Sequence, residues 1–462
     1  MKIKIDHIAK IEGHAGFVAD IVNGETTKAA FNVLEGSRLL EGILRDRKYS
    51  EVSQIAARIC GICPVVHNLT SLKALEDALD VKVSKQTVLL RKLMMLGQII
   101  NSHALHVFFF SLSDFFGIEN DLKLIEKYPE KTKQAVAIRE FGNKIIEVIG
   151  GRSIHPLTPE VSGFIRLPKT ESIKQIGEDA KKILPLAIEL ARFFAKLNYP
   201  NFERETKFIS LTNKNEYAIY DGTIFGALRR HAEFISASHN YNEISKPSFE
   251  NYGRARQVWD DKNRDIAAFM QKINEFQVAE DVVKRTTIDE KPYMVGAIAR
   301  INNNHKQLNK EAKKILKASK IKLPSQNPFH NILAQVVETV HCLEEVQKLI
   351  PKTMSSLRTK RSNPAIPPRD CFVANTPRND KMEGYDAIEA PRGTLFYFYE
   401  VGDSGLVKNC NIITPTAQNI ARLEKDLKIW LPQLQNLSEK EIQDKIRMLV
   451  RAYDPCLTCA TH

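Results

Sequence analysis

The sequence predicts an α+β protein that is predominantly helical, with one large domain in which a bundle of long helices adjoins small β-sheets near the N-terminus. Three observations support this class. Strand-like alternation is confined to the first part of the chain, helical periodicity dominates after Cys63, and two cysteine pairs stand near opposite ends of the 462 residues. Because both pairs must meet to share one metal centre, the chain is expected to form a single domain over residues 1–462.

The N-terminal segment, about residues 1–50, is expected to be rich in strands. Apolar and polar residues alternate in Lys2–Ile5 and in Gly16–Val22. Asn23-Gly24 follows and predicts a turn, because both residue types tolerate a positive φ. These features predict small β-sheets near the N-terminus.

A helical core is expected over about residues 85–350, and a C-terminal metal-binding segment over about residues 389–462. Apolar residues spaced three and four positions apart predict the helices. The predicted helices cover about Gln86–Phe110, Glu171–Lys196, Trp259–Val283 and Asn331–Ile350, with a last pair near Ala417–Leu434 and Ser438–Tyr453. No internal repeat or linker divides the chain into independent domains.

Composition excludes several classes of protein. A hydrophobic content of 43% with 26% charged residues is typical of a soluble globular protein. The most apolar window, about Leu96–Phe116, contains His103, His106 and Asp114, which favours a buried helix over a membrane span. The net charge of +12 comes from scattered lysines, which favours a lysine-rich surface over nucleic-acid binding. Sparse cysteines and a start without a signal-like apolar stretch predict a cytoplasmic protein.

The cysteine pairs are the feature of the sequence that indicates its chemistry. Only seven cysteines occur in the chain, and four of them form two Cys-x-x-Cys pairs. These lie in Arg58-Ile-Cys60-Gly-Ile-Cys63-Pro-Val-Val-His67 and in Asp454-Pro-Cys456-Leu-Thr-Cys459-Ala-Thr-His462. Two-residue spacing aims both sulfurs of a pair at one small target. Four thiolates suit zinc, an iron–sulfur cluster, or nickel with iron.

Two simpler interpretations explain less. A structural zinc site usually has its pairs ~15–20 residues apart in a small unit, whereas 393 positions separate Cys63 from Cys456 here. A thioredoxin-like dithiol would use one pair and leave the other unexplained. A histidine follows each pair. His67 is placed where a hydrogen-bond partner of a metal-bound thiolate is expected, and the side chain of His462 can turn inward.

Both cysteine motifs resemble the signatures of the large, catalytic subunit of nickel–iron hydrogenases, RxCGxCxxxH and DPCxxCxxH. Further resemblances occur in family order, at Ile5–His14 around Glu12, Leu34–Glu41, Ser102–His106, Glu389–Gly393 and Ile413–Asn419. Met294–Arg300 resembles the cytosolic bidirectional branch, especially its NAD(P)-linked and sulfur-reducing members. Some residues differ from those common in the family, such as Lys10 in place of arginine and Gln418 in place of tryptophan. None of these differences removes a metal ligand.

The resemblance implies a buried nickel–iron centre that splits H2 reversibly into protons and electrons. In the family all four thiolates bind nickel, so Cys60 and Cys456 would be terminal ligands. Cys63 and Cys459 would also bridge to an iron that carries carbon monoxide and two cyanides.

The resemblance also implies roles for side chains around this centre. Cys456 would accept the proton and Glu12 would pass it outward. Arg392 would lie over the metals, with Asp114 and Asp454 orienting it.

A further set of residues would complete the site. Thr416, with the arginine, would donate hydrogen bonds to the cyanides, and Pro391 and His67 would lie beside the ligands. Glu41, the His462 side chain and a backbone carbonyl near Ile412 resemble a magnesium site, for which oxygen ligands are suited.

Partners are expected because the sequence has no further cysteine set for an iron–sulfur cluster and no Gly-x-Gly-x-x-Gly fingerprint. Electrons would pass to a small subunit with Fe–S clusters, and through diaphorase-like flavin and Fe–S subunits to NAD(P) or a similar carrier. A maturation protease and nickel-insertion factors are also implied. The alternative is a metal-free or zinc-stabilised relative that serves as a scaffold subunit of a redox complex, and metal analysis separates the two.

Overall fold

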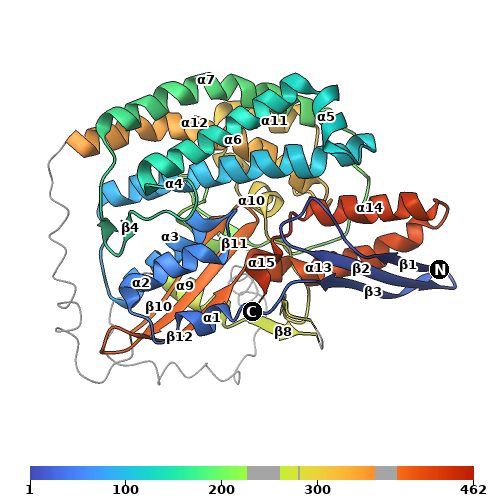
Figure 1. Cartoon of the computed structure of the whole chain (residues 1–462), viewed down its shortest axis with the longest axis horizontal. Helices are drawn as coiled ribbons and strands as arrows, with labels where there is room; N and C mark the ends of the chain where they lie inside the picture. The colour runs from blue at the N-terminus through green and yellow to red at the C-terminus, as the bar shows by residue number, and fades with distance from the viewer. Residues whose placement is uncertain (226–260, 279–280, 359–381, 462) are drawn as a thin grey trace, which may run out of the picture.

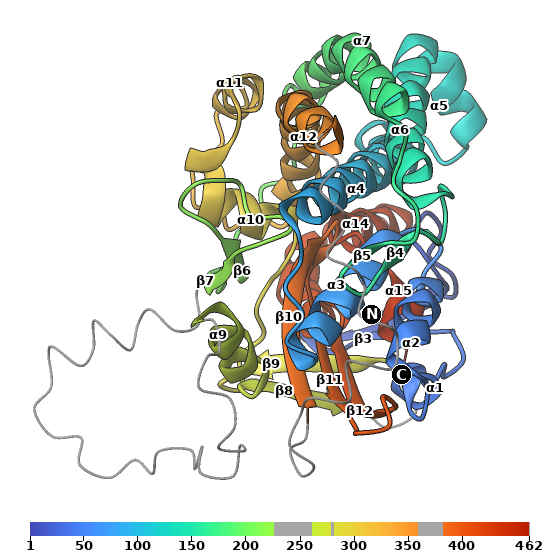
Figure 2. The same ribbon diagram turned by 90° about the vertical axis from the view of Figure 1, so that its left-hand side faces the viewer.

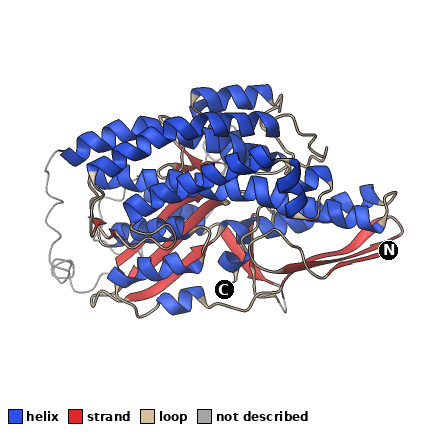
Figure 3. Ribbon diagram, turned by 45° about the horizontal axis from the view of Figure 1, so that its top comes forward, coloured by secondary structure: helices blue, strands red, loops and turns tan. Residues whose placement is uncertain are grey.

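The structure is a computed structural model that describes residues 1–225, 261–278, 281–358 and 382–461, and the structural statements below concern these residues. A layer of long helices lies over small antiparallel sheets (Figure 1). Coloured by secondary structure, the long helices stack above the strands, shorter helices lie below them, and the N-terminal sheet extends away from the bundle (Figure 3). The predicted α+β, mainly helical class is confirmed.

The N-terminal sheet forms as predicted. Its strands are β1 (Lys2–Ile5), β2 (Ala15–Val22) and β3 (Glu25–Val33), in the order β1-β2-β3 with antiparallel pairing. Asn23 and Gly24 connect β2 to β3 with positive φ angles of 52° and 82°. After β3 the chain becomes helical earlier than predicted. The elements that lead to the first cysteine pair are α1 (Leu40–Leu44), α2 (Tyr49–Ala56) and the 3-10 turn η1 (Ala57–Ile59).

Four long helices form the bundle. They are α4 (Lys85–Ala104), α6 (Pro129–Gly150), α7 (Thr170–Phe194) and α12 (His330–Arg358). α4 and α6 touch through two glycines, because a Cβ on Gly97 would lie 2.8 Å from the Gly142 carbonyl oxygen. α4 continues through a π-helical turn, η2 (Leu105–Ser111), and a 3-10 turn, η3 (Leu112–Phe116).

The predicted buried helix around Leu96–Phe116 is confirmed. The helical stretch Lys85–Phe116 is long and apolar enough to cross a membrane, but 78% of its apolar window is buried inside the protein. Its neighbours are other helices, so its apolar surface belongs to the core.

A second sheet was not predicted from the sequence. It consists of β10 (Met382–Ala390), β11 (Gly393–Val401) and β12 (Val407–Ile413), in antiparallel order β10-β11-β12. Eight of the nine residues of β10 are buried, so both of its faces are covered and no polar–apolar alternation appears. The sheets are therefore not confined to the N-terminus.

Helix α3 (Pro64–Ala78) packs on this second sheet, and Figure 2 shows it lying beside β10. The approach is close, because a Cβ on Gly384 would lie 2.1 Å from the carbonyl oxygen of Ala74. The Asp77 carboxylate accepts a hydrogen bond from the Tyr385 backbone N–H at 2.9 Å. Nearer the start of α3, His67 contacts Tyr397 on β11 at 2.8 Å. Cys63, directly before α3, is thereby held near the turn between β10 and β11.

One predicted helix is largely wrong. Of the described residues in Trp259–Val283, only α9 (Asp261–Met270) is helical; residues 259, 260, 279 and 280 lie outside the described part of the chain. β8 (Ile273–Gln277) follows and pairs antiparallel with β9 (Lys284–Ile288). The backbone pairing with a segment further along the chain overrides the local helical pattern.

The other predicted helices are present. Most end within a few residues of the expected positions, but α12 continues past Ile350 to Arg358. α13 (Pro415–Trp430) and α14 (Glu439–Ala452) form the C-terminal pair, and Ser438 and Glu441 form a capping box at the start of α14. α15 (Leu457–Ala460) is a single turn inside the second cysteine motif. The remaining elements are α5 (Asp121–Lys127), β4 (Pro159–Glu160), β5 (Gly163–Phe164), β6 (Ser210–Thr212), β7 (Thr223–Phe225), α10 (Ala297–Asn304), η5 (His305–Gln307), α11 (Lys310–Ala318) and η6 (Leu431–Leu434).

Candidate metal centre

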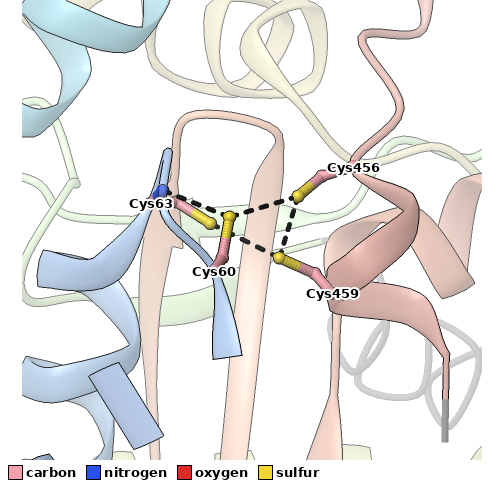
Figure 4. A group of neighbouring side chains, drawn as sticks. All are labelled: Cys60, Cys63, Cys456 and Cys459. Atoms are coloured by element: carbon pink, nitrogen blue, oxygen red, sulfur yellow. Dashed lines mark hydrogen bonds between the residues drawn. The ribbon is translucent and has the colours of Figure 1, made fainter. Parts of the chain in front are cut away.

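The two cysteine pairs meet in the interior. One ligand atom from each of Cys60, Cys63, Cys456 and Cys459 lies within 4.8 Å of the others, and all four side chains are buried. Figure 4 shows the four sulfurs pointing toward one another. The sulfur–sulfur distance is 3.5 Å for Cys60–Cys456 and for Cys63–Cys459, and 2.9 Å for Cys456–Cys459. The arrangement can hold a metal ion that favours soft ligands.

Backbone pairing brings the C-terminal pair to this place. Glu12 and Cys456 form a parallel β-bridge, in which the Leu457 N–H donates to the Glu12 carbonyl oxygen at 3.0 Å. Further along, Val283 and Thr461 form an antiparallel bridge. The C-terminal segment is therefore tied to two distant parts of the chain.

Arg38 links the two cysteine loops directly. Its Nη1 donates to the carbonyl oxygen of Ile59, next to Cys60, at 2.5 Å, and to that of Thr458 at 2.9 Å. One guanidinium thus bridges the backbone of both motifs. The sequence around Arg38 did not predict this role.

The electrostatics of the four thiols favour a bound cation. Hydrogen bonds from the thiols of Cys456, Cys459 and Cys63 lower the pKa of Cys60 well below its usual value. Backbone N–H groups also point at the Cys60 sulfur, including that of Cys63 at 3.4 Å. Burial raises the pKa of Cys456 and of Cys459 well above the usual value. The protein alone stabilises one thiolate, so ionising the others needs the positive charge of a metal.

Arg392 lies beside the cysteines at the turn between β10 and β11. Its Nε donates to the Asp454 carbonyl oxygen at 2.9 Å, and its Nη2 pairs with the Asp454 carboxylate at 2.9 Å. Asp454 also accepts from Gln335 Nε2 at 2.9 Å. Nη1 of Arg392 is buried and, among the described residues, has no hydrogen-bond partner. Such a donor needs an acceptor that the polypeptide does not provide.

A small cavity adjoins three of the cysteines. Its lining is mostly apolar, with the polar side chains of Arg392, His67 and Thr416 among it. The Thr416 hydroxyl oxygen accepts from the Cys456 N–H at 2.9 Å, which leaves its own proton free to donate. The lining residues are Cys63, Val66, His67, Ala390, Pro391, Arg392, Leu395, Pro415, Thr416, Cys456 and Cys459. The donor set suits small ligands that accept hydrogen bonds in a dry pocket.

A buried ion network stabilises the turn between β10 and β11. Arg300 donates to the carbonyl oxygens of Ala390 at 2.8 Å and Pro391 at 3.0 Å. Its guanidinium also pairs with Glu338 at 2.6 Å and with Glu389 at 3.1 Å. Arg300, whose charge is paired with two carboxylates, therefore fixes the backbone directly before Arg392.

Asp114 does not orient Arg392 as predicted. It forms an ion pair with Arg451, whose Nε donates to the Ala9 carbonyl oxygen at 3.0 Å. Burial raises the pKa of Asp114 to about 6, and Arg451 opposes that rise. Among described residues the ion pairs and hydrogen bonds of Arg392 go to Asp454. The family resemblance placed Asp114 beside Arg392. The order of residues along the chain does not show whether Asp114 pairs with Arg392 or with Arg451.

Glu12 lies next to the cysteines as the sequence implies. Thr458 holds its carboxylate, with the backbone N–H donating at 3.2 Å and the hydroxyl making a second, short hydrogen bond. Burial raises the pKa of Glu12, and charge on Cys60 raises it further, while hydrogen bonds from Cys456 and Thr458 oppose the rise. Thr458 occupies a variable position of the cysteine motif, so the motif gave no signal for it.

Two of the three predicted magnesium ligands, Glu41 and Ile412, lie within the described residues. Glu41 pairs with the Lys284 ammonium at 3.0 Å, and Lys284 also lies 3.7 Å from Glu275. Asn411 donates to Glu275 at 2.9 Å, and the next residue, Ile412, is buried on β12. His462 lies outside the described residues. The carboxylates of Glu41 and Glu275 suit a hard cation, with the Lys284 ammonium as a competing positive charge.

Replacing Arg38 by methionine tests its role as the link between the loops. We expect the variant to lose about 2–3 kcal/mol of stability, because two hydrogen bonds from a charged donor are removed from a partly buried place. Thermal unfolding of the purified protein measures this. The matched control is Arg45→Met, which removes one exposed contact to Asn409. Equal melting temperatures for the two variants would contradict the assignment.

Comparisons with known proteins place the chain in a family. Residues 38–144 and 146–462 match the family model of nickel-dependent hydrogenases. The chain is 30% identical to the alpha chain of sulfhydrogenase 1 from Pyrococcus furiosus, covering 100% of this chain and 98% of that protein. It is 26% identical to the vhu-type F420-non-reducing hydrogenase subunit of Methanocaldococcus jannaschii, covering 92% and 97%.

Solved structures share the fold. An NAD+-reducing [NiFe]-hydrogenase in the H2-reduced state matches with a TM-score of 0.79 at 24% identity, over 100% of this chain and 99% of that one. A [NiFeSe]-hydrogenase of Dm. baculatum matches with a TM-score of 0.65 at 20% identity, over the whole of both chains. Together with the four buried cysteines, the match over nearly the whole sequence shows that this chain belongs to the nickel-dependent hydrogenase large-subunit family.

Proposed function

We propose that the chain is the catalytic subunit of a nickel–iron hydrogenase that converts H2 reversibly into two protons and two electrons. The observation that carries this proposal is the group of four buried thiols beside Arg392, whose Nη1 has no partner among the described residues. When bound, the nickel–iron centre supplies the two-electron chemistry.

The four buried thiols are the proposed ligands. All four cysteines would hold nickel, and Cys63 and Cys459 would also hold iron; the small cavity is lined by these two and by Cys456. Carbon monoxide and cyanide on iron would fit the cavity's mainly apolar lining. Arg392 Nη1 and the Thr416 hydroxyl are the donors placed to serve the cyanides, and His67 and Pro391 complete the lining.

Proton transfer would run through Glu12. Burial raises the pKa of its carboxyl, and a hydrogen bond with the Cys456 thiol opposes that rise, so the carboxyl lies where it could take a proton from that thiol. Thr458 keeps the carboxylate in place through two donors. Asp454 would keep Arg392 charged and oriented, since it contacts two of the three guanidinium nitrogens.

A magnesium ion near the C-terminus is part of the proposal. Glu41, the carbonyl oxygen of Ile412 and the His462 side chain would bind it. Support comes from the Val283–Thr461 bridge, which carries the chain end to the strand that holds Lys284, the partner of Glu41. Binding would displace the Lys284 ammonium from the Glu41 carboxylate.

Electrons would leave towards an Fe–S small subunit that docks over the first cysteine loop. Gly61 is exposed between the buried Cys60 and Cys63, and a Cβ there would meet no atom within 4 Å. Exposed apolar side chains flank this loop, including Leu39 and Leu157. Leu157 belongs to a segment that Gln54 holds by its backbone oxygens, at 3.4 Å and 3.2 Å. The relatives are named as subunits of larger enzymes, which fits such a partner.

NAD(P) or a similar soluble carrier is the proposed final acceptor. Support comes from the names of similar proteins, which include an NAD+-reducing hydrogenase and the alpha chain of a sulfhydrogenase. Diaphorase-like flavin and Fe–S subunits would connect the small subunit to that carrier in the cytoplasm, and a maturation protease with nickel-insertion factors would load the site.

Metal analysis with infrared spectroscopy tests the centre. We expect nickel and iron in equal amounts, and infrared bands of bound carbon monoxide and cyanide, in the purified complex. Cys456→Ser should lose nickel because it removes one of four thiolates, whereas Cys342→Ser, at a buried cysteine away from the cluster, should retain it. Zinc in place of nickel and iron would favour the scaffold alternative.

Glu12→Gln tests the proton path. The amide keeps the shape and can still accept the Thr458 backbone N–H but cannot carry a proton, so H2/D2O exchange should fall by roughly 100-fold or more. The metal content and the infrared bands should stay unchanged. Glu51→Gln, on the exposed face of α2, is the control. Full exchange activity in the Glu12 variant would rule out this path.

Matched surface substitutions test whether the small subunit docks over the loop between Cys60 and Cys63. Leu157→Glu should reduce recovery of the Fe–S subunit with this chain, because Leu157 is 42% exposed beside the cysteine loop. Ile429→Glu changes a side chain that is 41% exposed on α13 and should leave recovery unchanged. Affinity purification followed by iron and subunit quantification measures both. Equal recovery for the two variants would place the partner elsewhere.

A further inference from the structure

The start of α4 and the end of α12 lie at the same end of the helix bundle (Figure 1). Residues near both of them line a cleft that is separate from the cysteine site. Its volume is about 550 Å³, within the range typical of sites for small molecules. A hydrogen bond from Gln86 Nε2 to the Ser356 carbonyl oxygen, at 2.9 Å, joins the two helices beside it. None of its lining residues belongs to the lining of the cavity at the cysteines.

The cleft has an apolar wall. Val83, Val88 and Leu89 come from the start of α4 and the turn before it, and each is half-buried, so part of its surface faces solvent. Leu349 of α12 is buried opposite them. This wall offers a hydrocarbon group a place to leave water.

Four lysines and two glutamates surround the apolar wall. Lys92 is neutralised by Glu216, which it contacts through both carboxylate oxygens at 2.7 Å. Lys348 lies 3.7 Å from Glu345. Lys85 and Lys352 are exposed, and no described side chain forms an ion pair or hydrogen bond with either of them. Two positive charges therefore remain for a ligand.

One lining residue, Tyr217, is buried and held by polar contacts. Its ring centroid lies 4.7 Å from that of His341, and its hydroxyl donates to Glu338 at 2.5 Å. Glu338 in turn pairs with Arg300. This part of the lining is thus fixed by the ion network that supports the β10–β11 turn.

We propose that this cleft binds a phosphate monoester with a short apolar body. The two uncommitted ammonium groups match the charge of a phosphate dianion, and the wall of Val83, Val88 and Leu89 receives the hydrocarbon. This binding is independent of the hydrogenase activity proposed above, since none of the cleft residues touches the cysteine centre.

Calorimetric titration of the purified complex tests the proposal, with hexyl phosphate as the probe and inorganic phosphate and hexanol as its two halves. We expect hexyl phosphate to bind more tightly than either half. Lys352→Glu and Lys85→Glu should each weaken it about tenfold, the effect of reversing one partly screened charge near the phosphate. Leu89→Ser should weaken hexyl phosphate and leave inorganic phosphate unchanged.

Lys317→Glu supplies the control, because this lysine is exposed on α11 and does not line the cleft. It should leave the affinity for hexyl phosphate unchanged. An equal loss in the control and in Lys352→Glu would overturn the proposal in favour of a general surface-charge effect. Absence of binding to the complex would also overturn it, and metal content, measured on the same sample, shows separately whether the hydrogenase centre is present.

Discussion

Four thiols buried within 4.8 Å of one another impose the main constraint on this protein, because so small a dry space cannot hold several negative charges without a cation. The polypeptide stabilises one of them, at Cys60, with thiol and backbone donors. Elsewhere it adds a positive side chain, Arg392, whose charge is fixed by Asp454. Bound metal ions must neutralise the remaining thiolates. The four-thiol geometry therefore requires a cationic cofactor.

The surroundings keep this arrangement rigid through paired charges rather than through apolar packing alone. Arg300, Glu338 and Glu389 are fully buried, and each has a partner that satisfies it. Such pairs add little net stability, but removing one partner leaves a buried charge and is costly. Their effect is to fix one conformation of the turn that carries Arg392. Arg38 does the same for the two cysteine loops, from the partly exposed side of the site.

Much of the fold and of the centre could be predicted from the sequence, and the failures have physical causes. Amphipathic helices and the N-terminal sheet carry a periodic signal, and the cysteine motifs carry a chemical one. The β10–β12 sheet carries neither, because burial on both faces removes the alternation. Asp114 was placed by order along the chain, but its partner is Arg451. Thr458 and Arg38 act through contacts between segments more than 400 residues apart, and such contacts leave no local pattern.

The separation of the two cysteine pairs also governs when the site can come into being. Ribosomes make a chain from its N-terminus, so α4, α6 and α7 can pack against one another long before Cys456 and Cys459 have been synthesised. Until then the first pair, Cys60 and Cys63, faces an incomplete pocket. The bridge between Glu12 and Cys456 joins segments from opposite parts of the sequence, so the four-thiol site requires both segments to be present and packed together.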